Sequence, residues 1–352
     1  MGAGMMNALA SLPVLGICGA SGSGKTTLIE ALIPRFLADG LRVAVIKDGA
    51  HRVMVDAPGK DSDRFFQAGA DVALCGQAQF FRSHAGAEFS RRARELGQCY
   101  DLVLVEGHAS TPIQKIWLLG QGHEKPPEHA GEILSLLAKT ERDPDALYAW
   151  ICSWLSGQWS RRPLYGCILI GGKSSRMGRP KHLIRQANQT WLERAVQRLS
   201  PLVDQVALSG RGQVPDCLAH LPRLADVPGI AGPMTGLLAA MRWQPEAAWI
   251  LLACDQPEFS SEAVSWLRDQ AGPSIHAVLP DLAGDGRLEP LLAWYDSRCR
   301  AALEDLARRG CLRLSGLAGQ PGVISPTPPA HLRPCWRNVN TPEELARRGN
   351  QV

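Results

Sequence analysis

Short apolar runs alternate with amphipathic segments along most of this 352-residue chain. The first run, PVLGICGA, precedes a helical pattern from Lys25 to about Asp39, which is followed by the run LRVAVIKD. Unbroken Val and Ile in that second run indicate a strand covered on both faces, as in a parallel sheet. The runs YDLVLVEGH and KIWLLG repeat the strand pattern further along. The first half is therefore predicted to be a parallel α/β sheet that opens with a strand, a helix and a strand.

The same alternation starts again after residue 165. The strand patterns GCILIGG, DQVALSG, AWILLACD and HAVLP alternate with the helical patterns WLERAVQRL, MTGLLAAMRW and SEAVSWLRDQ. Between the halves, GQWSRRPLY combines two Arg and a Pro with a glycine, Gly157, that is expected to end the helix DALYAWICSWLSG,. At roughly 150 residues per domain, the length fits two domains. We predict one α/β domain over residues 1–157, a linker over 158–164 and a second, doubly wound α/β domain over 165–352.

The last part of the chain is less regular. Residues 316–334 are rich in Gly and Pro, which predicts irregular structure,. The segment NVNTPEELARR then predicts a final helix, because Thr341 and Glu344 have the spacing of a capping box,.

Composition and charge limit the classes of partner. The chain has 38 Lys and Arg against 34 Asp and Glu, so its net charge of +4 gives no broad positive field for nucleic acid,. The first residues have neither the basic start nor the apolar stretch of a signal peptide. No later segment approaches the roughly 20 apolar residues of a membrane span. Ten scattered cysteines without a CxxC pair indicate reduced thiols,. We expect a cytoplasmic protein with no nucleic-acid partner and no membrane partner.

The motif GASGSGKTT follows the first strand and opens the first helix. Its glycines let backbone amides turn toward phosphate oxygens, Lys25 reaches the outer phosphates, and the hydroxyl of Thr26 can bind Mg²⁺. Glu106 ends the strand LVLVE and is the candidate acid beside that metal. A polar loop after the second strand offers further candidates: Asp48, His51, Asp56, Lys60 and Asp61,. The predicted nucleotide-binding residues of this half are Gly19, Ser21, Gly22, Ser23, Gly24, Lys25, Thr26, Thr27 and Glu106.

A second phosphate-handling motif, LIGGKSSRMGRPK, follows the first strand of the second half. Gly171 and Gly172 allow a flat base to approach the main chain, while Arg176 and Lys181 neutralise charge on the α-phosphorus and on departing pyrophosphate. Asp255 closes the strand AWILLACD, at the sheet edge where ligands of such folds bind, and can hold Mg²⁺. The remaining candidates for the base and ribose pocket are Asp226 and the turn GPMTG, residues 232–236.

These motifs carry two family resemblances. SGSGKTTLIEALIPRF, VDAPGKDSDRFFQAGA and DLVLVEG resemble the MobB family, the GTP-binding accessory proteins of molybdenum cofactor biosynthesis. LIGGKSSRMG, GPMTG, LLACDQP, LEPLLAWYD and NVNTPEEL resemble the MobA family, the molybdenum cofactor guanylyltransferases. The resemblance implies an N-terminal P-loop NTPase-like domain fused to a Rossmann-like nucleotidyltransferase domain, and GTP as substrate.

The second resemblance assigns roles position by position. It implies that Asn338 and Asn340 face the pterin and that Arg176, Lys181 and Asp255 are catalytic, Asp255 with Mg²⁺. The nucleotide-binding positions that it implies are Leu169, Gly171, Gly172, Lys181, Ser209, Asp226 and Asp255. Ser209 stands where the guanylyltransferases often have an Asn, and Pro180 stands where they more often have an Asp.

The implied reaction needs few groups. A phosphomonoester has a second pKa near about 6 and is mostly dianionic at neutral pH, so the terminal phosphate of molybdopterin can attack GTP without a general base. Catalysis then depends on Mg²⁺, cations and alignment. The sequence offers cations and carboxylates rather than a catalytic triad, which fits this reaction.

Several alternatives remain open on the sequence alone. The order Arg-Pro-Lys also occurs in the related cytidylyltransferases, although Gly171 with Gly172 is the form associated with guanine use. A sugar-1-phosphate nucleotidyltransferase of the same superfamily is a second alternative. The first domain is either a P-loop kinase, a weak GTPase or an adaptor that delivers cofactor to molybdoenzyme chaperones or cofactor-insertion proteins.

Overall fold

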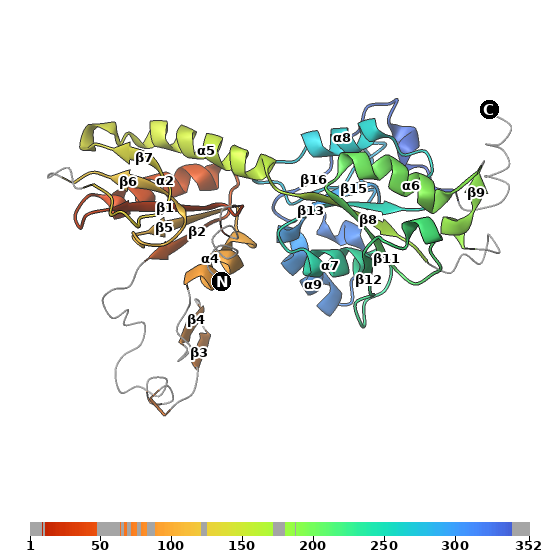
Figure 1. Cartoon of the computed structure of the whole chain (residues 1–352), viewed down its shortest axis with the longest axis horizontal. Coiled ribbons are helices and arrows are strands. Elements are labelled where there is room, and N and C mark those ends of the chain that lie inside the picture. Colours follow the sequence, from red (N-terminus) through yellow and green to blue (C-terminus); the bar gives the residue numbers. More distant parts are fainter. Residues whose placement is uncertain are drawn as a thin grey trace. The chain divides into compact units, whose positions relative to one another are not determined.

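The computed structural model describes residues 9, 11–47, 64, 67–68, 72–75, 79–82, 89–120, 125–171, 180–186 and 188–339. The chain divides into two compact units, Met1–Ser153 and Trp154–Val352, which are taken separately below (Figure 1). In the described residues, no helix is both long and apolar enough to cross a bilayer.

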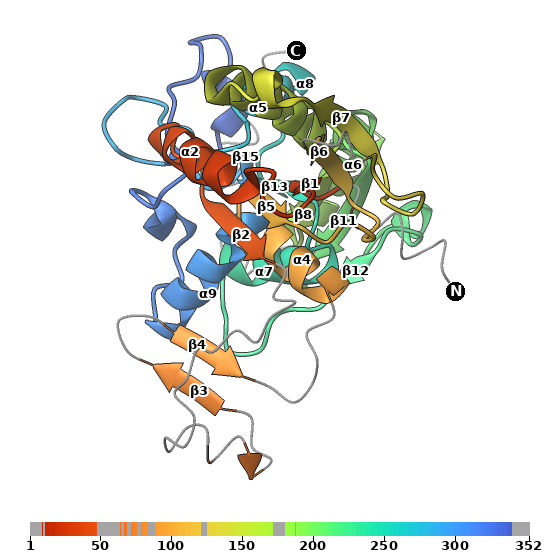
Figure 2. The same ribbon diagram turned by 90° about the vertical axis from the view of Figure 1, so that its left-hand side faces the viewer.

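The first unit is built on a five-stranded sheet in the order β2-β5-β1-β6-β7, and all of its neighbouring strands are parallel. Figures 1 and 2 show α2 and α5 on one side of this sheet and α4 on the other. A separate antiparallel pair is formed by β3 and β4. The elements are β1 (Val14–Gly19), α2 (Lys25–Ala38), β2 (Val43–Lys47), β3 (Val72–Cys75), β4 (Gln79–Arg82), α4 (Phe89–Gly97), β5 (Leu102–Glu106), β6 (Gln114–Leu118), β7 (Ile133–Leu137) and α5 (Pro144–Ser160).

The second unit has a seven-stranded sheet in the order β12-β11-β8-β13-β15-β14-β16. Buried residues of α6 and α8 pack on one face, and those of α7 and α9 pack on the other. A two-stranded sheet pairs β9 with β10. The elements are β8 (Leu164–Leu169), β9 (Arg185–Gln186), β10 (Gln189–Thr190), α6 (Trp191–Leu199), β11 (Gln205–Ser209), β12 (Arg223–Leu224), α7 (Pro233–Trp243), β13 (Ala248–Ala253), α8 (Ser261–Asp269), β14 (Ala277–Val278), β15 (Ala293–Asp296), α9 (Arg300–Arg308) and β16 (Val323–Ile324), with short 3₁₀ turns between them.

The α/β fold class predicted from the sequence is confirmed, but several strands were not predicted, among them β7 in the first sheet and β12, β15 and β16 in the second. β15 lies between β13 and β14 and is antiparallel to both, so the second sheet is mixed. Its four residues are all buried, and a short buried run carries no mark of strand direction. The start of α6 is fixed by local contacts. The hydroxyl of Thr190 accepts a hydrogen bond from the amide of Glu193, whose carboxylate accepts one from the amide of Thr190, which caps α6.

The expectation that Gly157 ends the helix before the linker is wrong. α5 continues through Gly157 to Ser160. A glycine weakens a helix but does not stop it when later residues are held by packing. Here the guanidinium groups of Arg162 and Arg298 lie 4.2 and 3.8 Å from the ring of Trp159.

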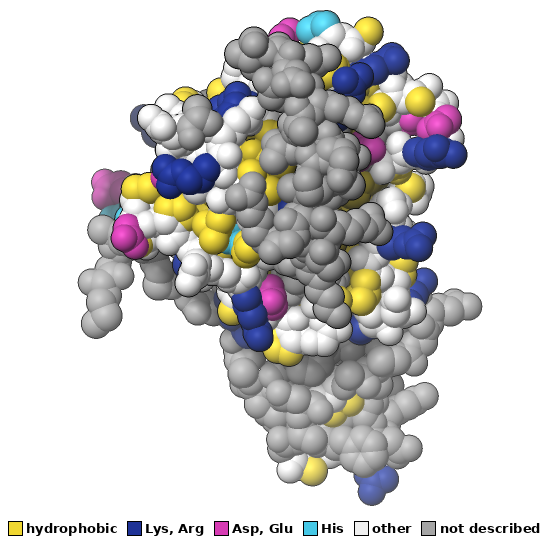
Figure 3. Space-filling model, turned by 90° about the vertical axis from the view of Figure 1, so that its right-hand side faces the viewer, with side chains coloured by type: hydrophobic (Ala, Val, Ile, Leu, Met, Phe, Trp, Pro, Cys, Tyr) yellow, Lys and Arg dark blue, Asp and Glu magenta, His cyan; other side chains and the backbone are white. Residues whose placement is uncertain are grey.

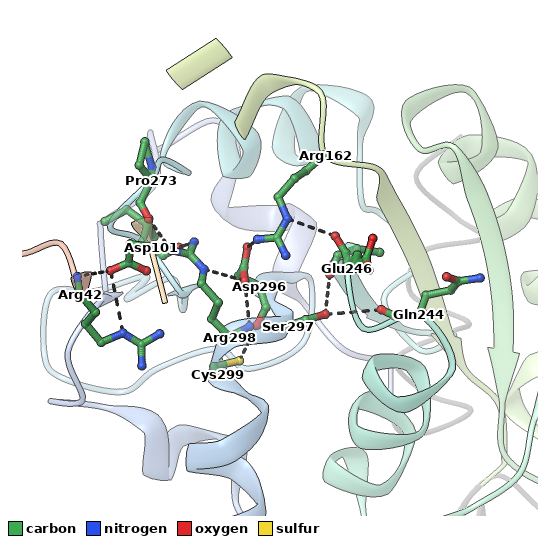
Figure 4. Close-up of polar contacts among 12 residues, drawn as sticks. Arg42, Asp101, Arg162, Gln244, Glu246, Pro273, Asp296, Ser297, Arg298 and Cys299 are labelled. Atoms are coloured by element: carbon green, nitrogen blue, oxygen red, sulfur yellow. Dashed lines mark hydrogen bonds and ion pairs between the residues drawn. The ribbon is translucent and has the colours of Figure 1, made fainter. Parts of the chain in front are cut away.

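Those two arginines belong to a buried ion cluster in the second unit (Figure 4). The carboxylate of Asp296 accepts hydrogen bonds from the guanidinium groups of Arg162 at 2.5 Å and Arg298 at 2.8 Å. The side chains of Asp296 and Arg298 are 0% exposed. Arg298 also donates to the carbonyls of Pro273 and Ile275. The cluster therefore joins the end of α5 to β15 and to the segment that leads into β14.

Charged side chains are dispersed on the surface that can be followed in Figure 3. On that face, the Lys and Arg side chains of the described residues lie apart from one another among apolar and uncharged ones.

Candidate functional site

The first candidate site is the turn between β1 and α2. Gly24 immediately precedes α2 in a left-handed conformation, with φ of 85°, which a glycine adopts without strain. Gly19 is needed for close approach, because a Cβ there would lie 2.4 Å from the carbonyl oxygen of Leu118. The ammonium of Lys25 donates to the carbonyls of Gly19 and Ala20 at 3.0 and 2.6 Å. The turn thus curls around the lysine head, and the amino end of α2 adds a partial positive charge.

Glu106 lies where the sequence analysis expected it, beside this turn. In the sheet it pairs with Ile17 of β1 and with Lys47 of β2. Its carboxylate accepts a hydrogen bond of 2.7 Å from the hydroxyl of Thr26 and lies 3.4 Å from the ammonium of Lys47. Mg²⁺ bound to a nucleotide usually has a few protein oxygen ligands, and phosphate oxygens and waters fill its other coordination positions. A hydroxyl and a carboxylate held together at the phosphate turn suit this role.

Arg142 is a second cation at this turn, and the sequence analysis missed it. One of its terminal nitrogens donates to the carbonyl of Ser23, and the other donates to the carbonyls of Leu119 and Leu137. The guanidinium thereby ties the phosphate turn to the ends of β6 and β7. It lies 119 residues from Ser23 in the chain, so no local motif could have indicated it.

The second candidate site is a cavity of about 400 Å³ at the carboxyl edge of the second sheet. Three parallel strands end there, because Leu169 of β8 is in register with Ser209 of β11 and with Ala253 of β13. We call it the C-terminal cavity. Its lining is Leu169, Ile170, Gly171, Lys181, His182, Ser209, Gly210, Arg211, Asp226, Gly232, Pro233, Thr235, Gly236, Ala253, Cys254, Asp255, Leu291 and Asn338.

Glycines allow the walls of this cavity to approach one another. A Cβ at Gly210 would lie 1.8 Å from the carbonyl oxygen of Ile170, and one at Gly171 would lie 2.8 Å from that of Arg211. Both residues have positive φ, 114° and 104°. Gly236, in the first turn of α7, would meet the side chains of Leu169 and Ser209. The main chain is therefore exposed to any group that enters here, and the amino end of α7 faces the same cavity.

Lys181 and Asp255 meet in the cavity, although 74 residues separate them. The ammonium of Lys181 lies 2.8 Å from one oxygen of Asp255, and the two side chains are 20% and 22% exposed. The other Asp255 oxygen is buried without a hydrogen-bond partner in the described residues. Such an unsatisfied carboxylate oxygen costs free energy, and it is suited to a cation brought in with phosphates.

The remaining predicted residues are placed as follows. Asp226 lies at the cavity with its carboxylate 3.8 Å from the guanidinium of Arg211. Asn338 lines the cavity, and the next residue, Val339, donates its amide to the carbonyl of Asp255 at 2.8 Å. Ser209 is 2% exposed and its hydroxyl has no partner in the described part of the chain. The predicted residues outside the described part are Asp48, His51, Asp56, Lys60, Asp61, Gly172, Arg176 and Asn340, together with the final capped helix.

Metal ligands are sparse at both sites. Within the described ranges, no group of three or more His, Cys, Asp or Glu side chains is arranged to hold a metal ion. In the second unit, Asp255 is a single candidate ligand. In the first unit, Glu106 and Thr26 form a pair. They fit an ion that is carried mainly by a nucleotide rather than one enclosed by protein.

Fold and sites together define the class of protein: a P-loop unit joined to an α/β unit of the nucleotidyltransferase type. Residues 14–139 match the family model of the molybdopterin guanine dinucleotide synthesis protein B, and residues 166–318 match that of the MobA-like NTP transferase domain. The chain belongs to the first of these families, and it carries the MobA-like domain after it.

Three curated relatives have similar sequences. The molybdopterin-guanine dinucleotide biosynthesis adapter protein of Haemophilus influenzae is 39% identical over 132 residues, which are 36% of this chain and 74% of that protein. The molybdenum cofactor biosynthesis bifunctional protein of Synechocystis is 36% identical over 140 residues, 39% of this chain but only 40% of that protein. The probable molybdenum cofactor guanylyltransferase of Bacillus cytotoxicus is 28% identical over 189 residues, 51% of this chain and 94% of that protein.

Proposed function

We propose that the chain transfers GMP from GTP to molybdenum-molybdopterin, and that its first unit is a GTP-binding accessory domain. The observation that carries the proposal is the C-terminal cavity, in which Gly171, Lys181, Asp226, Asp255 and Asn338 meet at the ends of three strands. The matched MobA-like domain and the name of the Bacillus cytotoxicus relative support guanylyl transfer as the reaction.

In this proposal the base and ribose lie against Leu169, Gly171, Ser209 and Asp226. The ammonium of Lys181 binds phosphate oxygens, and Arg176 adds a second cation. An oxygen of the molybdopterin phosphate attacks the α-phosphorus of GTP in line; the bond to the β-phosphate breaks and pyrophosphate leaves. The nucleophile is already anionic, so the protein aligns the groups and neutralises charge without accepting a proton. Gly172 completes the base site, and Asn338 and Asn340 face the pterin.

Magnesium belongs to the same proposal. The free oxygen of Asp255 and the Thr26–Glu106 pair are the residues that would hold it, one at each site. When bound, Mg²⁺ withdraws charge from the phosphate oxygens as a Lewis acid. We place the reaction in the cytoplasm, where GTP and Mg²⁺ are supplied.

For the first unit we propose GTP binding at residues 19–27, with slow hydrolysis. The Haemophilus influenzae relative is named an adapter protein. This name supports an adapter role, and we propose that the unit passes the finished cofactor to molybdoenzyme chaperones or cofactor-insertion proteins.

A product assay tests the proposed reaction. The chain is incubated with molybdenum-molybdopterin, Mg²⁺ and one nucleotide at a time, and the products are identified by mass. We expect the guanine dinucleotide form and one equivalent of pyrophosphate with GTP. A cytosine dinucleotide with CTP, or a product only when a sugar 1-phosphate is supplied, would contradict the proposal.

Arg142 provides a prediction for the first unit. Arg142→Ala is expected to weaken GTP binding at the phosphate turn about tenfold, because it removes the charge-assisted hydrogen bond to the carbonyl of Ser23 and the link from the turn to the ends of β6 and β7,. The measurement is a fluorescence titration with methylanthraniloyl-GTP in a chain that also carries Lys181→Ala, so that the first unit dominates the signal. Arg35→Ala is the control, because Arg35 forms a surface pair with Asp145. Equal affinities for both variants would show that Arg142 does not shape the turn.

A further inference from the structure

Residues 210–213 follow β11, and the first two of them, Gly210 and Arg211, line the C-terminal cavity. This segment, called the wall below, is held from two sides. The guanidinium of Arg223 donates to the carbonyls of Gly210 and Gly212 at 3.2 and 3.1 Å. The imidazole of His182 lies 2.9 Å from the carbonyl oxygen of Gln213 through Nε2. A carbonyl can only accept, so Nε2 carries the proton and Nδ1 is free of one in the neutral ring.

His182 is placed for this task by burial. It is 3% exposed, lines the cavity and follows Lys181 directly. Burial lowers the pKa of His182, and the nearby charge of Arg223 lowers it further, against the opposing hydrogen bond to Gln213. A neutral ring beside Lys181 adds no charge to the site, so its contribution is shape and a single donated hydrogen bond.

The fit between the ring and the wall is close. A Cβ at Gly212 would lie 2.9 Å from Cε1 and 3.0 Å from Nε2 of His182, and the described residues place nothing else within 4 Å of it. Gly212 does not have a positive φ, so an alanine there would be opposed by the His182 ring and not by the backbone. Only a glycine at position 212 allows the main chain to approach the His182 ring this closely.

We propose that His182 is a positioning residue that fixes residues 210–213 as the wall against which the nucleoside of GTP lies. This inference rests on the proposed function, because it assumes that the cavity takes the nucleotide. It predicts an effect on nucleotide affinity rather than on the transfer step, because His182 holds the wall and touches no reacting atom.

The test compares KM for GTP with kcat in the pyrophosphate-release assay. His182→Ala is expected to raise KM about three- to tenfold, the value of one hydrogen bond, and to leave kcat within about twofold. His182→Gln should restore most of the affinity, because its amide can donate to the carbonyl of Gln213. An unchanged KM in His182→Ala, or His182→Gln as impaired as His182→Ala, would overturn the proposal.

A double-mutant cycle adds a readout that simple loss of folding would not give. Gly212→Ala should raise KM in the wild-type background and have almost no further effect when His182→Ala is present, because the opposing ring is gone. Gly272→Ala is the matched control, since Gly272 has ordinary φ and open space around it. Additive effects of Gly212→Ala and His182→Ala would contradict the assigned contact.

Failure of the proposed function can be told apart from failure of this inference. If the wild-type chain releases no pyrophosphate from GTP, guanylyl transfer is contradicted. The wall is then tested by methylanthraniloyl-GTP binding in a chain with Lys25→Ala, which weakens the signal of the first unit. If His182→Ala weakens methylanthraniloyl-GTP binding, the result supports the wall. Binding equal to that without the His182 substitution, or no binding at all, contradicts it.

Discussion

Lys181→Ala is expected to slow pyrophosphate release from GTP at least about 100-fold, the loss seen when one preorganised charge-stabilising group is removed. Lys181 is the described cation closest to Asp255 in the C-terminal cavity. The measurement is kcat at saturating GTP and molybdopterin. Arg242→Ala is the control, because its ion pair with Glu304 is 47% and 37% exposed and such surface pairs contribute little. A rate within threefold of wild type would show that Lys181 takes no part in the reaction.

The pairing of Lys181 with Asp255 requires one further comparison. If Lys181 served only to neutralise Asp255, removing both charges in a Lys181→Met, Asp255→Asn double variant would restore activity. We expect the double variant to stay as slow as the single ones, because each side chain binds a different part of the magnesium nucleotide. Recovery to near the wild-type rate would instead assign the pair a purely structural role.

Asp296→Ala is expected to lower the free energy of unfolding of the second unit by about 3–5 kcal/mol, because it leaves two buried guanidinium groups without their carboxylate. Asp296 and Arg298 are 0% exposed and Arg162 is 4% exposed. The measurement is urea denaturation followed by tryptophan fluorescence, since most of the ten tryptophans of the chain lie in the second unit. The control is Asp305→Ala, whose carboxylate is 34% exposed beside Arg309. Equal losses of unfolding free energy in the two variants would show that the buried ion cluster does not stabilise the second unit more than a surface pair does.

The same carboxylate predicts how stability depends on pH. Burial would raise the pKa of Asp296, but Arg162 and Arg298 together lower it to about 2. An unfolded Asp has a pKa of about 3.9. The depressed pKa therefore stabilises the folded state fully above the unfolded value, and this contribution is lost as pH falls through 4 toward about 2,. Asp296→Ala should flatten the loss of stability in that interval, and an unchanged acid profile would contradict the assignment.

Patterns that depend on local sequence could be predicted. The phosphate turn and the helix that follows it are specified by neighbouring residues, and α2 begins at Lys25 as expected. The placement of Glu106 and Asp255 at the edges of the two sheets could be predicted, because each stands at or just after the end of an apolar strand and parallel strands bring their carboxyl ends to one edge. The meeting of Lys181 with Asp255 follows from that rule and from the glycine turn after β8.

Contacts that depend on distant residues could not be predicted. His182 holds a carbonyl 31 residues away, and nothing near it in the chain indicates this. Lys115 was expected in an apolar strand, yet it is 0% exposed and its ammonium is held by the carbonyls of Thr111, Ile113 and Ala130. Burial lowers its pKa. A charged residue inside a core depends on carbonyl groups that only the folded loops bring together.

The most direct measurement of the central claim is a crystal structure of the chain with Mg²⁺ and a GTP analogue that cannot release pyrophosphate. The account predicts density for the base and ribose against Leu169, Gly171, Ser209 and Asp226, and for the triphosphate beside Lys181 and Asp255. An analogue bound only at residues 19–26, with no nucleotide in the C-terminal cavity, would contradict it.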